Sequence, residues 1–302
     1  MSVVPKPPMS SKDDPLPALI RALRGRVPTD RMRAAKDLGR LGWLARDALT
    51  PLITALNDDE GKVREAAAHA VGQMGPEALP ALCEMLGHED KYVRRNAVWA
   101  LGKLGPLARP ALSNLCRALK DADPRTASGA AQALGNMGAD AADAVPQLAE
   151  AMRGTNIVLC RLAAKALSQI GPPALATLIA HLQHADPFVR GESALALGWM
   201  GPVARSAVPF LAHVVRGPRK ARPKAKPKRN PDSETATPPA IAASSSEGAT
   251  ADENCRVYAA QALGRIGPVA AGAVSDLQDA AEFGPEALRQ AAEQAVRMIQ
   301  GG

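Results

Sequence analysis

A glycine recurs along this chain at intervals close to 30 residues, and each time it follows the same pattern of apolar residues. The repeated positions are Gly42, Gly75, Gly105, Gly138, Gly171, Gly201 and Gly267. Successive glycines are 33, 30, 33, 33, 30 and 66 residues apart. Self-similarity at such a period is typical of a solenoid, in which each repeat buries its apolar face only against its neighbours. The period therefore directs the search for function to a long repetitive surface rather than to one catalytic pocket.

The residues before each glycine have the spacing of an amphipathic helix. Ala97, Leu101 and Leu104 precede Gly105 by eight, four and one residues, which gives the i, i+4, i+7 stripe of a buried helix face. A glycine can adopt the left-handed conformation that ends a helix, and Pro106 after it cannot continue one. We predict that the second helix of every repeat ends at this glycine.

Composition favours an all-α fold with closely packed helices. Apolar residues make up 46% of the chain but aromatic residues only 3%, so the core consists of small and aliphatic side chains. An alanine lies five residues before most of the glycines, as Ala133 does before Gly138. Side chains of this size allow neighbouring helices to approach closely.

The turn before each second helix carries its own polar pattern. An acidic residue lies four positions ahead of an arginine, as in Asp90 and Arg94, or Asp186 and Arg190. The aspartate can cap the start of the helix, and the arginine can reach an aspartate of a neighbouring repeat. Ala127 and Cys160 interrupt the arginine pattern in the middle of the chain.

These features together, in outline DxxVRxxAxxALGxxGPxA, resemble the short HEAT-like repeats of phycobilisome-lyase-type proteins. The pattern is clearest in residues 186–204, DPFVRGESALALGWMGPVA. The resemblance implies an α-solenoid of the armadillo/HEAT-like superhelix type, built of about eight two-helix repeats, with each second helix on the concave side. In the last repeat the same register predicts a second helix from Leu288 to Ile299, with Val296 and Ile299 in the core.

The interval of 66 residues before Gly267 indicates an insertion in the seventh repeat. We divide the chain into a flexible N-terminal segment (1–15), HEAT-like repeats (16–216), a disordered insertion rich in basic residues, Pro and Ser (217–251), and the final repeats with a C-terminal cap (252–302). The insertion begins with a basic stretch, residues 216–229, that could bind nucleic acid. The alternative is a solvated loop without a role of its own.

Bulk properties favour an acidic partner and a cytoplasmic location. The formal charge is +7 and the isoelectric point is about 9.4, although part of the excess lies in the insertion. The N-terminal residues contain no apolar run of signal-peptide type, and no stretch reaches the length of a transmembrane segment. Four cysteines without C-x-x-C spacing are expected to be free buried thiols.

Aromatic and basic residues share the outward face of the second helices, which we predict to be a binding surface for an acidic protein or peptide. The candidate residues are Tyr92, Arg95, Trp99, Lys103, Arg161, Lys165, Phe188, Trp199 and Tyr258. Cations would supply long-range attraction, and the rings would supply apolar or stacking anchors. A nucleic-acid strand would use the same combination, so it remains the second interpretation. In the third interpretation these large side chains only fill gaps between helices.

An enzyme of a related HEAT-repeat family is a less favoured alternative. Deoxyhypusine hydroxylases of this fold hold two irons through His-Glu pairs at the starts of second helices, where this chain has Arg64-Glu65 and Arg94-Arg95. The dipeptide His88-Glu89 falls in a turn instead. A bilin-lyase-like activity has no diagnostic residue. We therefore predict no catalytic residue, no metal site and no cofactor.

The register makes a prediction about stability. Ala133→Trp should force neighbouring helices apart and lower the free energy of unfolding by about 1–3 kcal/mol, whereas a substitution at the outward-facing Gln132 should change it little. Chemical denaturation of both variants provides the measurement. Superimposable unfolding curves would contradict the register.

Overall fold

The computed structural model describes residues 14–217 and 246–301, and every regular element in these ranges is helical. The chain forms two compact units, Met1–Ala174 and Leu175–Gly302. The predicted N-terminal segment and most of the predicted insertion lie outside the described residues. The helix that follows the insertion begins at Ser246, ahead of the predicted boundary at residue 252.

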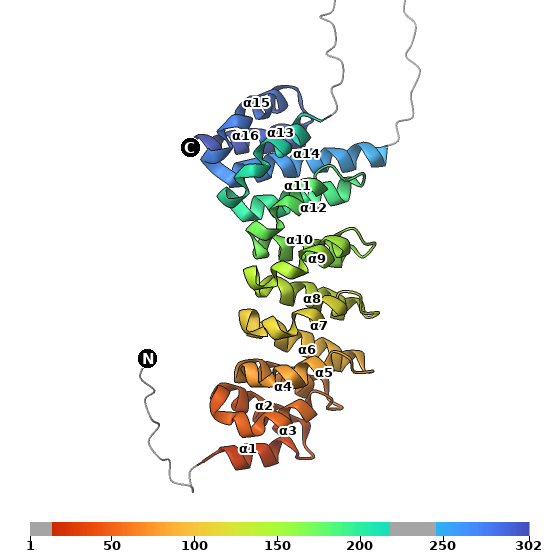
Figure 1. Ribbon diagram of the computed structural model, residues 1–302, viewed down its shortest axis with the longest axis vertical. Helices are drawn as coiled ribbons and strands as arrows, with labels where there is room; N and C mark the ends of the chain where they lie inside the picture. Colours follow the sequence, from red (N-terminus) through yellow and green to blue (C-terminus); the bar gives the residue numbers. More distant parts are fainter. Residues whose placement is uncertain (1–13, 218–245, 302) are drawn as a thin grey trace, which may run out of the picture. The chain divides into compact units, whose positions relative to one another are not determined.

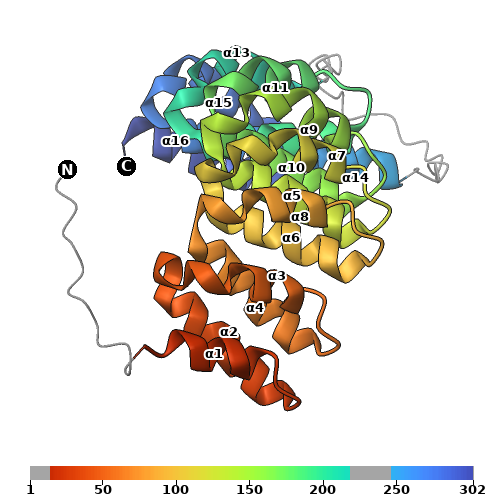
Figure 2. The same ribbon diagram turned by 60° about the horizontal axis from the view of Figure 1, so that its bottom comes forward.

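The first unit consists of five helix pairs, which follow one another in chain order (Figures 1 and 2). The pairs are α1 (Leu16–Leu23) and α2 (Pro28–Leu41); α3 (Leu49–Ala55) and α4 (Gly61–Met74); α5 (Leu79–Met85) and α6 (Lys91–Leu104); α7 (Leu112–Ala118) and α8 (Pro124–Asn136); α9 (Val145–Met152) and α10 (Ile157–Ile170). The second helices, α2 to α10 in even numbers, pack one on the next and form one layer. We call this layer the second-helix layer.

The second unit has three pairs built in the same way. They are α11 (Leu175–His181) and α12 (Pro187–Met200); α13 (Val208–Arg216) and α14 (Ser246–Ile266); α15 (Val274–Phe283) and α16 (Glu286–Gln300). In this unit α12 packs on α14, and α14 packs on α16. Over the described residues the chain therefore has eight pairs, which confirms the predicted solenoid of about eight two-helix repeats.

The recurrent glycines end the second helices, as predicted, but their conformation differs from the expected one. Gly105 has φ 55° and ψ −127°, and Gly201 has φ 59° and ψ −138°. These values share the positive φ of a left-handed cap but not its ψ, and the chain continues from each glycine into a 3₁₀ turn. Residues with a Cβ rarely adopt this conformation, so glycine is required there.

The predicted core positions are buried in the body of each unit. Ala97 and Leu101 are fully buried, and Leu104 is nearly so. At the C-terminal end the prediction was partly wrong, since Ile299 is buried but Val296 is only half-buried. Ala292 and Ala295 belong to the buried stripe of α16 instead.

A second glycine, three residues before the recurrent one, sets the spacing between second helices. A Cβ placed on Gly135 would lie 3.0 Å from the Cα atom of Ala166, and one on Gly198 would lie 2.9 Å from the Cα atom of Ala262. The same meeting of glycine and alanine recurs between α2 and α4, between α6 and α8, and between α14 and α16. The backbones of these neighbouring second helices are therefore in direct contact, as the recurrent alanine five residues before the glycine predicted. We call this line of contacts the glycine–alanine seam.

This seam predicts an unusual response to alanine. Gly198→Ala should destabilise the protein by about 1–3 kcal/mol despite the better helix propensity of alanine, because the neighbouring backbone has no room to move. The matched control is Gly272→Ala in the same unit, where a Cβ would meet nothing within 4 Å. That variant should be neutral or slightly more stable. Thermal unfolding in which both variants respond alike would contradict the close approach.

Candidate binding groove

Arginines at the starts of several second helices bind their own turn, and some of them also bind an aspartate of the next repeat. Arg94 on α6 donates from Nη1 to the carbonyl oxygens of His88 and Glu89, both at 2.8 Å. Its other edge donates to both carboxylate oxygens of Asp121, at 2.7 and 2.9 Å. Arg31 makes the same contacts with its own turn and with Asp58. The predicted reach of an arginine to the aspartate of a neighbouring repeat is therefore confirmed at these positions.

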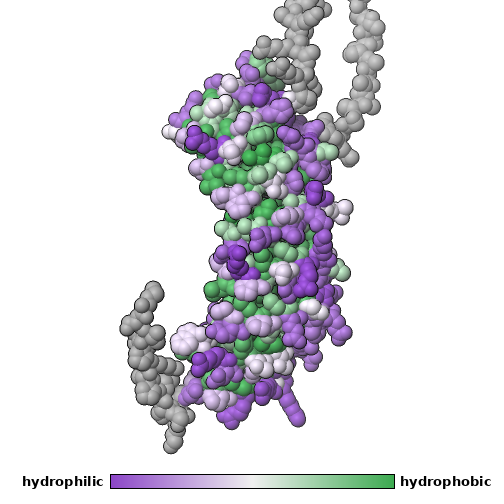
Figure 3. Space-filling view, viewed as in Figure 1, coloured by the Kyte–Doolittle hydropathy of each residue, from purple (hydrophilic) through white to green (hydrophobic). Residues whose placement is uncertain are grey.

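The polar turns form one edge of the first unit. Burial is the largest single influence on the pKa of Asp121 and raises it, but the hydrogen bonds and charge of Arg94 and the backbone N–H of Asp123 together bring the pKa below its ordinary value. Figure 3 shows hydrophilic residues gathered along the edge where Figure 1 places the loops between paired helices of this unit. His88 takes part in this edge as a turn residue, since its Nδ1 accepts a hydrogen bond of 3.0 Å from the backbone N–H of Asp90.

Arg95, predicted as a cation available to a partner, is already neutralised within the protein. Its guanidinium forms a two-point ion pair with Asp123, which also caps α8 by accepting from the backbone N–H of Thr126 at 2.8 Å. The side chains of Arg95 and Asp123 are only 20% and 8% exposed. Hydrogen bonds from Arg95 hold the pKa of Asp123 well below its usual range, against the opposing effect of burial.

Tyr92 is 44% exposed, and three cations of the protein lie beside its ring. The guanidiniums of Arg64 and Arg95 are 5.0 and 5.1 Å from its ring centroid, and the ammonium of Lys91 is 5.4 Å away. Arg64 has the same place in its repeat as Arg94. In the repeat that follows Arg64, however, His88 stands at the position that corresponds to Asp121, the ion-pair partner of Arg94. The ring of Tyr92 therefore takes the position of a carboxylate and stabilises Arg64 through its π face.

Trp99 is the second accessible aromatic side chain of α6, after Tyr92. It is 38% exposed, and its ring centroid lies 5.4 Å from that of His69 on α4, at an angle of 40°. The Lys103 ammonium lies 5.0 Å from the indole centroid. The neighbouring side chains thus hold the ring in place while one part of it stays open to a ligand.

A groove of about 640 Å³ crosses the second-helix layer beside Trp99. Its lining comes from α4, α6, α8 and α10. Arg95, Trp99 and Lys103 are the predicted site residues that it brings together. Small residues such as Gly102, Gly129 and Ala133 also line it, so part of its surface is helix backbone.

The groove contains residues that the sequence prediction did not include. Asn96, Gln132 and Asn136 line it with side-chain amides, and Val158 contributes an apolar surface that is 60% exposed. Val158 could have been found, because it has the same place in its repeat as Tyr92. The amides could not, since polar residues at outward positions are common and carry no distinct signal.

The other predicted residues lie apart from this groove. Arg161 and Lys165 are exposed on α10 but do not line it. Phe188, Trp199 and Tyr258 belong to the second unit, where Trp199 is 46% exposed. A Cβ on Gly191 would lie 3.0 Å from the ring of Tyr258, so this tyrosine packs against α12.

None of the four cysteines, all of which are described, forms a disulfide; Cys160 and Cys255 are buried, whereas Cys83 and Cys116 are half-buried. Across residues 14–217 and 246–301, no three His, Cys, Asp or Glu side chains lie together as a metal ion would require. In the same ranges no helix has the length and apolar character needed to cross a membrane.

Comparison with known proteins shows a family. The family profile described as HEAT repeats matches residues 16–102, 79–164 and 145–225, which together span more than half of the 302 residues. No curated protein matches the chain. Importin beta is similar in structure, with a TM-score of 0.58 and 14% identity over 95% of this chain and 41% of that chain. This likeness concerns the fold.

Two further structures are similar at lower TM-scores. Human deoxyhypusine hydroxylase in complex with glycerol has a TM-score of 0.37 and 23% identity, over 95% of this chain and 96% of that chain. The complex of CpcE and CpcF of phycocyanin lyase from Nostoc has a TM-score of 0.42 and 22% identity, over 92% of this chain and 99% of that chain.

The ion pair beside the groove predicts a pH dependence of stability. Because the pKa of Asp123 is lower in the folded chain than in the unfolded one, its contribution is complete above its ordinary value of about 4 and is lost as the pH falls below it. Asp123→Asn should lower the free energy of unfolding by about 1–3 kcal/mol at neutral pH and flatten its dependence on pH between about 5 and 2.

The control is Asp140→Asn, which breaks the exposed pair with Arg109 and should change stability by less than about 0.5 kcal/mol. Denaturant unfolding as a function of pH provides the measurement. An unchanged pH profile in Asp123→Asn would show that the ion pair does not form in solution.

Proposed function

The chain belongs to the HEAT-repeat family, and from this premise we propose that it is a non-catalytic scaffold. Its partner is a protein or peptide, held in the groove of the second-helix layer of the first unit. The observation that carries the proposal is the position of Trp99, partly open beside the groove and fixed between His69 and Lys103.

Trp99 has the properties of a binding anchor. Tryptophan offers a large contact area, and a ring already held by its neighbours loses little conformational entropy on binding. The exposed side chain of Val158 lines the same groove and offers a second apolar contact. A partner that covers both would bury apolar surface over the width of two or more second helices.

The charges around the groove favour an acidic partner. Lys103 and Arg125 line it, and neither forms an ion pair with another described residue. Glu65 is the opposing carboxylate among the lining residues, because the charge of Arg95 is balanced by Asp123. The available charge is therefore positive, although smaller than the sequence pattern predicted.

The groove suits an extended peptide. Small residues leave backbone accessible, and the amides of Asn96 and Gln132 can both donate to and accept from a peptide main chain. A groove of this size holds a few side chains of a partner. Affinity would then depend on one large apolar residue placed against Trp99 and on acidic residues near Lys103 and Arg125.

A single-stranded nucleic acid is the second candidate, because a base could stack on Trp99 while Lys103 and Arg125 contact phosphates. The two partners differ in their dependence on salt. Binding of a nucleic acid without sequence preference weakens steeply as the salt concentration rises. Binding anchored by an apolar side chain weakens less, since contact area does not depend on counter-ions.

The decisive experiment selects ligands from a display library of random peptides with the intact protein and measures the affinity of the best binders. Trp99→Ala should weaken binding by about 2 kcal/mol, which is about thirtyfold in Kd. Trp43→Ala is the matched control, because Trp43 is a tryptophan of the same unit that is 66% exposed and lies outside the groove. Lys103→Glu should slow association and reduce its dependence on salt.

The same measurement with an oligothymidylate probe separates the two candidates. Selection of acidic peptides containing a large apolar residue, with loss of binding in Trp99→Ala alone, supports the peptide scaffold. Tight oligothymidylate binding that falls steeply with salt, without any peptide being selected, would replace it with the nucleic-acid function. Equal effects of the two tryptophan variants would place the binding surface elsewhere.

A further inference from the structure

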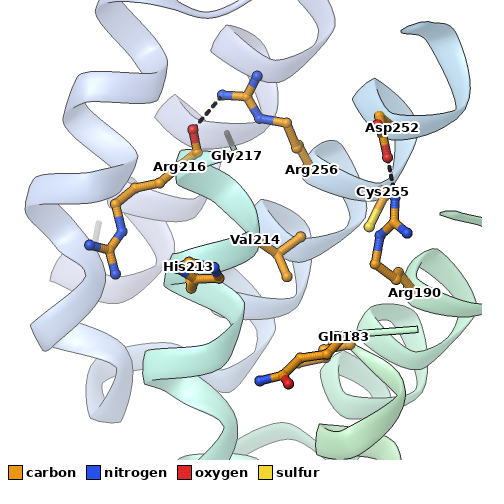
Figure 4. Close-up of a pocket in the computed structure, with 10 residues that line it drawn as sticks. Gln183, Arg190, His213, Val214, Arg216, Gly217, Asp252, Cys255 and Arg256 are labelled. Atoms are coloured by element: carbon orange, nitrogen blue, oxygen red, sulfur yellow. Dashed lines mark hydrogen bonds and ion pairs between the residues drawn. The ribbon is translucent and has the colours of Figure 1, made fainter. Parts of the chain in front are cut away.

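The second unit contains a cavity of about 630 Å³ that is separate from the proposed peptide groove (Figure 4). It lies among α11, α12, α13 and α14, and its lining includes Leu182, Arg190, His213, Val214, Cys255 and Arg256. The volume is within the range of pockets that bind small molecules. Neither the repeat pattern nor the proposed function uses this cavity.

Arg256 has an unusual position among the arginines of the repeat. Its Nε donates to the carbonyl oxygen of Val215 at 2.9 Å, and its Nη2 lies 3.5 Å from that of Arg216. Arg94, at the same place in its own repeat, binds Asp121 in the following repeat. The residue corresponding to Asp121 is Phe283, which is 72% exposed. Arg256 therefore finds no carboxylate among the described residues.

The partial burial of Arg256 makes its unpaired positive charge unfavourable in free energy. Burial lowers the pKa of Arg256 below its ordinary value, and only the charge of Glu253 acts in the opposite direction. An arginine stays charged under these conditions, so its unsatisfied donors favour an anion. Arg64 also lacks an acidic partner among the described residues, but its guanidinium lies against the ring of Tyr92.

The other charges around the cavity are already balanced. Arg190 pairs with Asp252, and Arg216 pairs with Asp276 at 3.2 Å. In Figure 4 the guanidinium of Arg216 extends away from Val214 and Cys255. His213 is exposed, lines the cavity and makes no side-chain hydrogen bond to any described residue. The uncompensated positive charge of the cavity is thus that of Arg256, with His213 as a further donor.

Gln183 contributes a polar side chain to the remaining walls, and Leu182, Val214 and Cys255 contribute apolar ones. Leu182 and Cys255 are each 2% exposed, and Val214 projects into the region between Arg256 and Gln183 in Figure 4. We propose that this cavity binds a small organic anion, whose carboxylate or phosphate group accepts hydrogen bonds from Arg256 while its apolar part contacts Leu182, Val214 and Cys255. The proposal is independent of the peptide groove, since all of its residues belong to the second unit.

Isothermal titration of the intact protein with four probes tests this chemistry. The probes are phenyl phosphate, benzoate, the uncharged benzamide and inorganic phosphate. At least one aromatic anion should bind about tenfold more tightly than benzamide, because a hydrogen bond to a charged group contributes more than a neutral one. The stronger of phenyl phosphate and benzoate identifies the anionic group. Equal affinity for benzamide, or for inorganic phosphate and phenyl phosphate, would overturn the proposal.

Variants then test the role of Arg256. Arg256→Gln should weaken binding about tenfold or more. Arg64→Gln is the matched control, because Arg64 also donates its hydrogen bonds to backbone carbonyl oxygens, forms no ion pair with a described residue and lies in the other unit. Arg256 also holds the middle of α14 to the end of α13, so thermal unfolding of each variant is recorded alongside.

His213→Glu provides a second test that does not depend on the stability of Arg256→Gln. The side chain of His213 is exposed, so the fold should tolerate the change, and a carboxylate at this point should repel the anion and weaken binding about tenfold. Wild-type affinity in His213→Glu, together with wild-type affinity in a folded Arg256→Gln, would show that the anion binds elsewhere.

Discussion

The direct contact between the backbones of successive second helices is the constraint on which the rest of the structure depends. A glycine on one helix meets an alanine on the next, as Gly102 meets Ala133 and Gly264 meets Ala295. This contact fixes both the distance and the rotation of each second helix, because a side chain larger than alanine at either position would separate the backbones. The outward residues of each helix are then presented in a defined register, and Trp99 and Lys103 lie beside the groove for this reason.

The arginines near the helix starts provide hydrogen-bond donors for the backbone carbonyl oxygens of the turns. Each guanidinium binds carbonyl oxygens that no helix can satisfy, and an aspartate of the next repeat balances its charge where one is present. Where the aspartate is missing, the structure shows a different solution at each place. Tyr92 covers Arg64, whereas Arg256 remains beside a cavity.

Both candidate sites occur where the repeat pattern is interrupted. The groove includes the starts of α8 and α10, where Ala127 and Cys160 replace the arginine. The thiol of Cys160 donates to the carbonyl oxygens of Gly154 at 3.2 Å and of Ala151 at 3.5 Å. The cavity of the second unit lies at an arginine that lacks its aspartate. Where the arginine and its aspartate are both present, their side chains fill the space between neighbouring repeats. Where one of them is missing, space is left that a ligand can occupy.

Sequence by itself determined the helices, their pairing and their buried faces, because these depend on local periodicity and on glycines that end each helix. It identified Trp99 and Lys103 as outward-facing for the same reason. It could not show that Asp123 neutralises Arg95, nor that the guanidinium of Arg64 lies over the ring of Tyr92, since these contacts join residues of different repeats.

The conformation of the recurrent glycines, the partial burial of Val296, the groove and the cavity were likewise decided by tertiary structure. A groove or cavity is the space left after helices have packed, and its position depends on side chains from several repeats at once. Charge follows the same logic: the number of cations can be counted in the sequence, but only packing decides which of them, such as Arg256, keeps no counter-charge among the described residues.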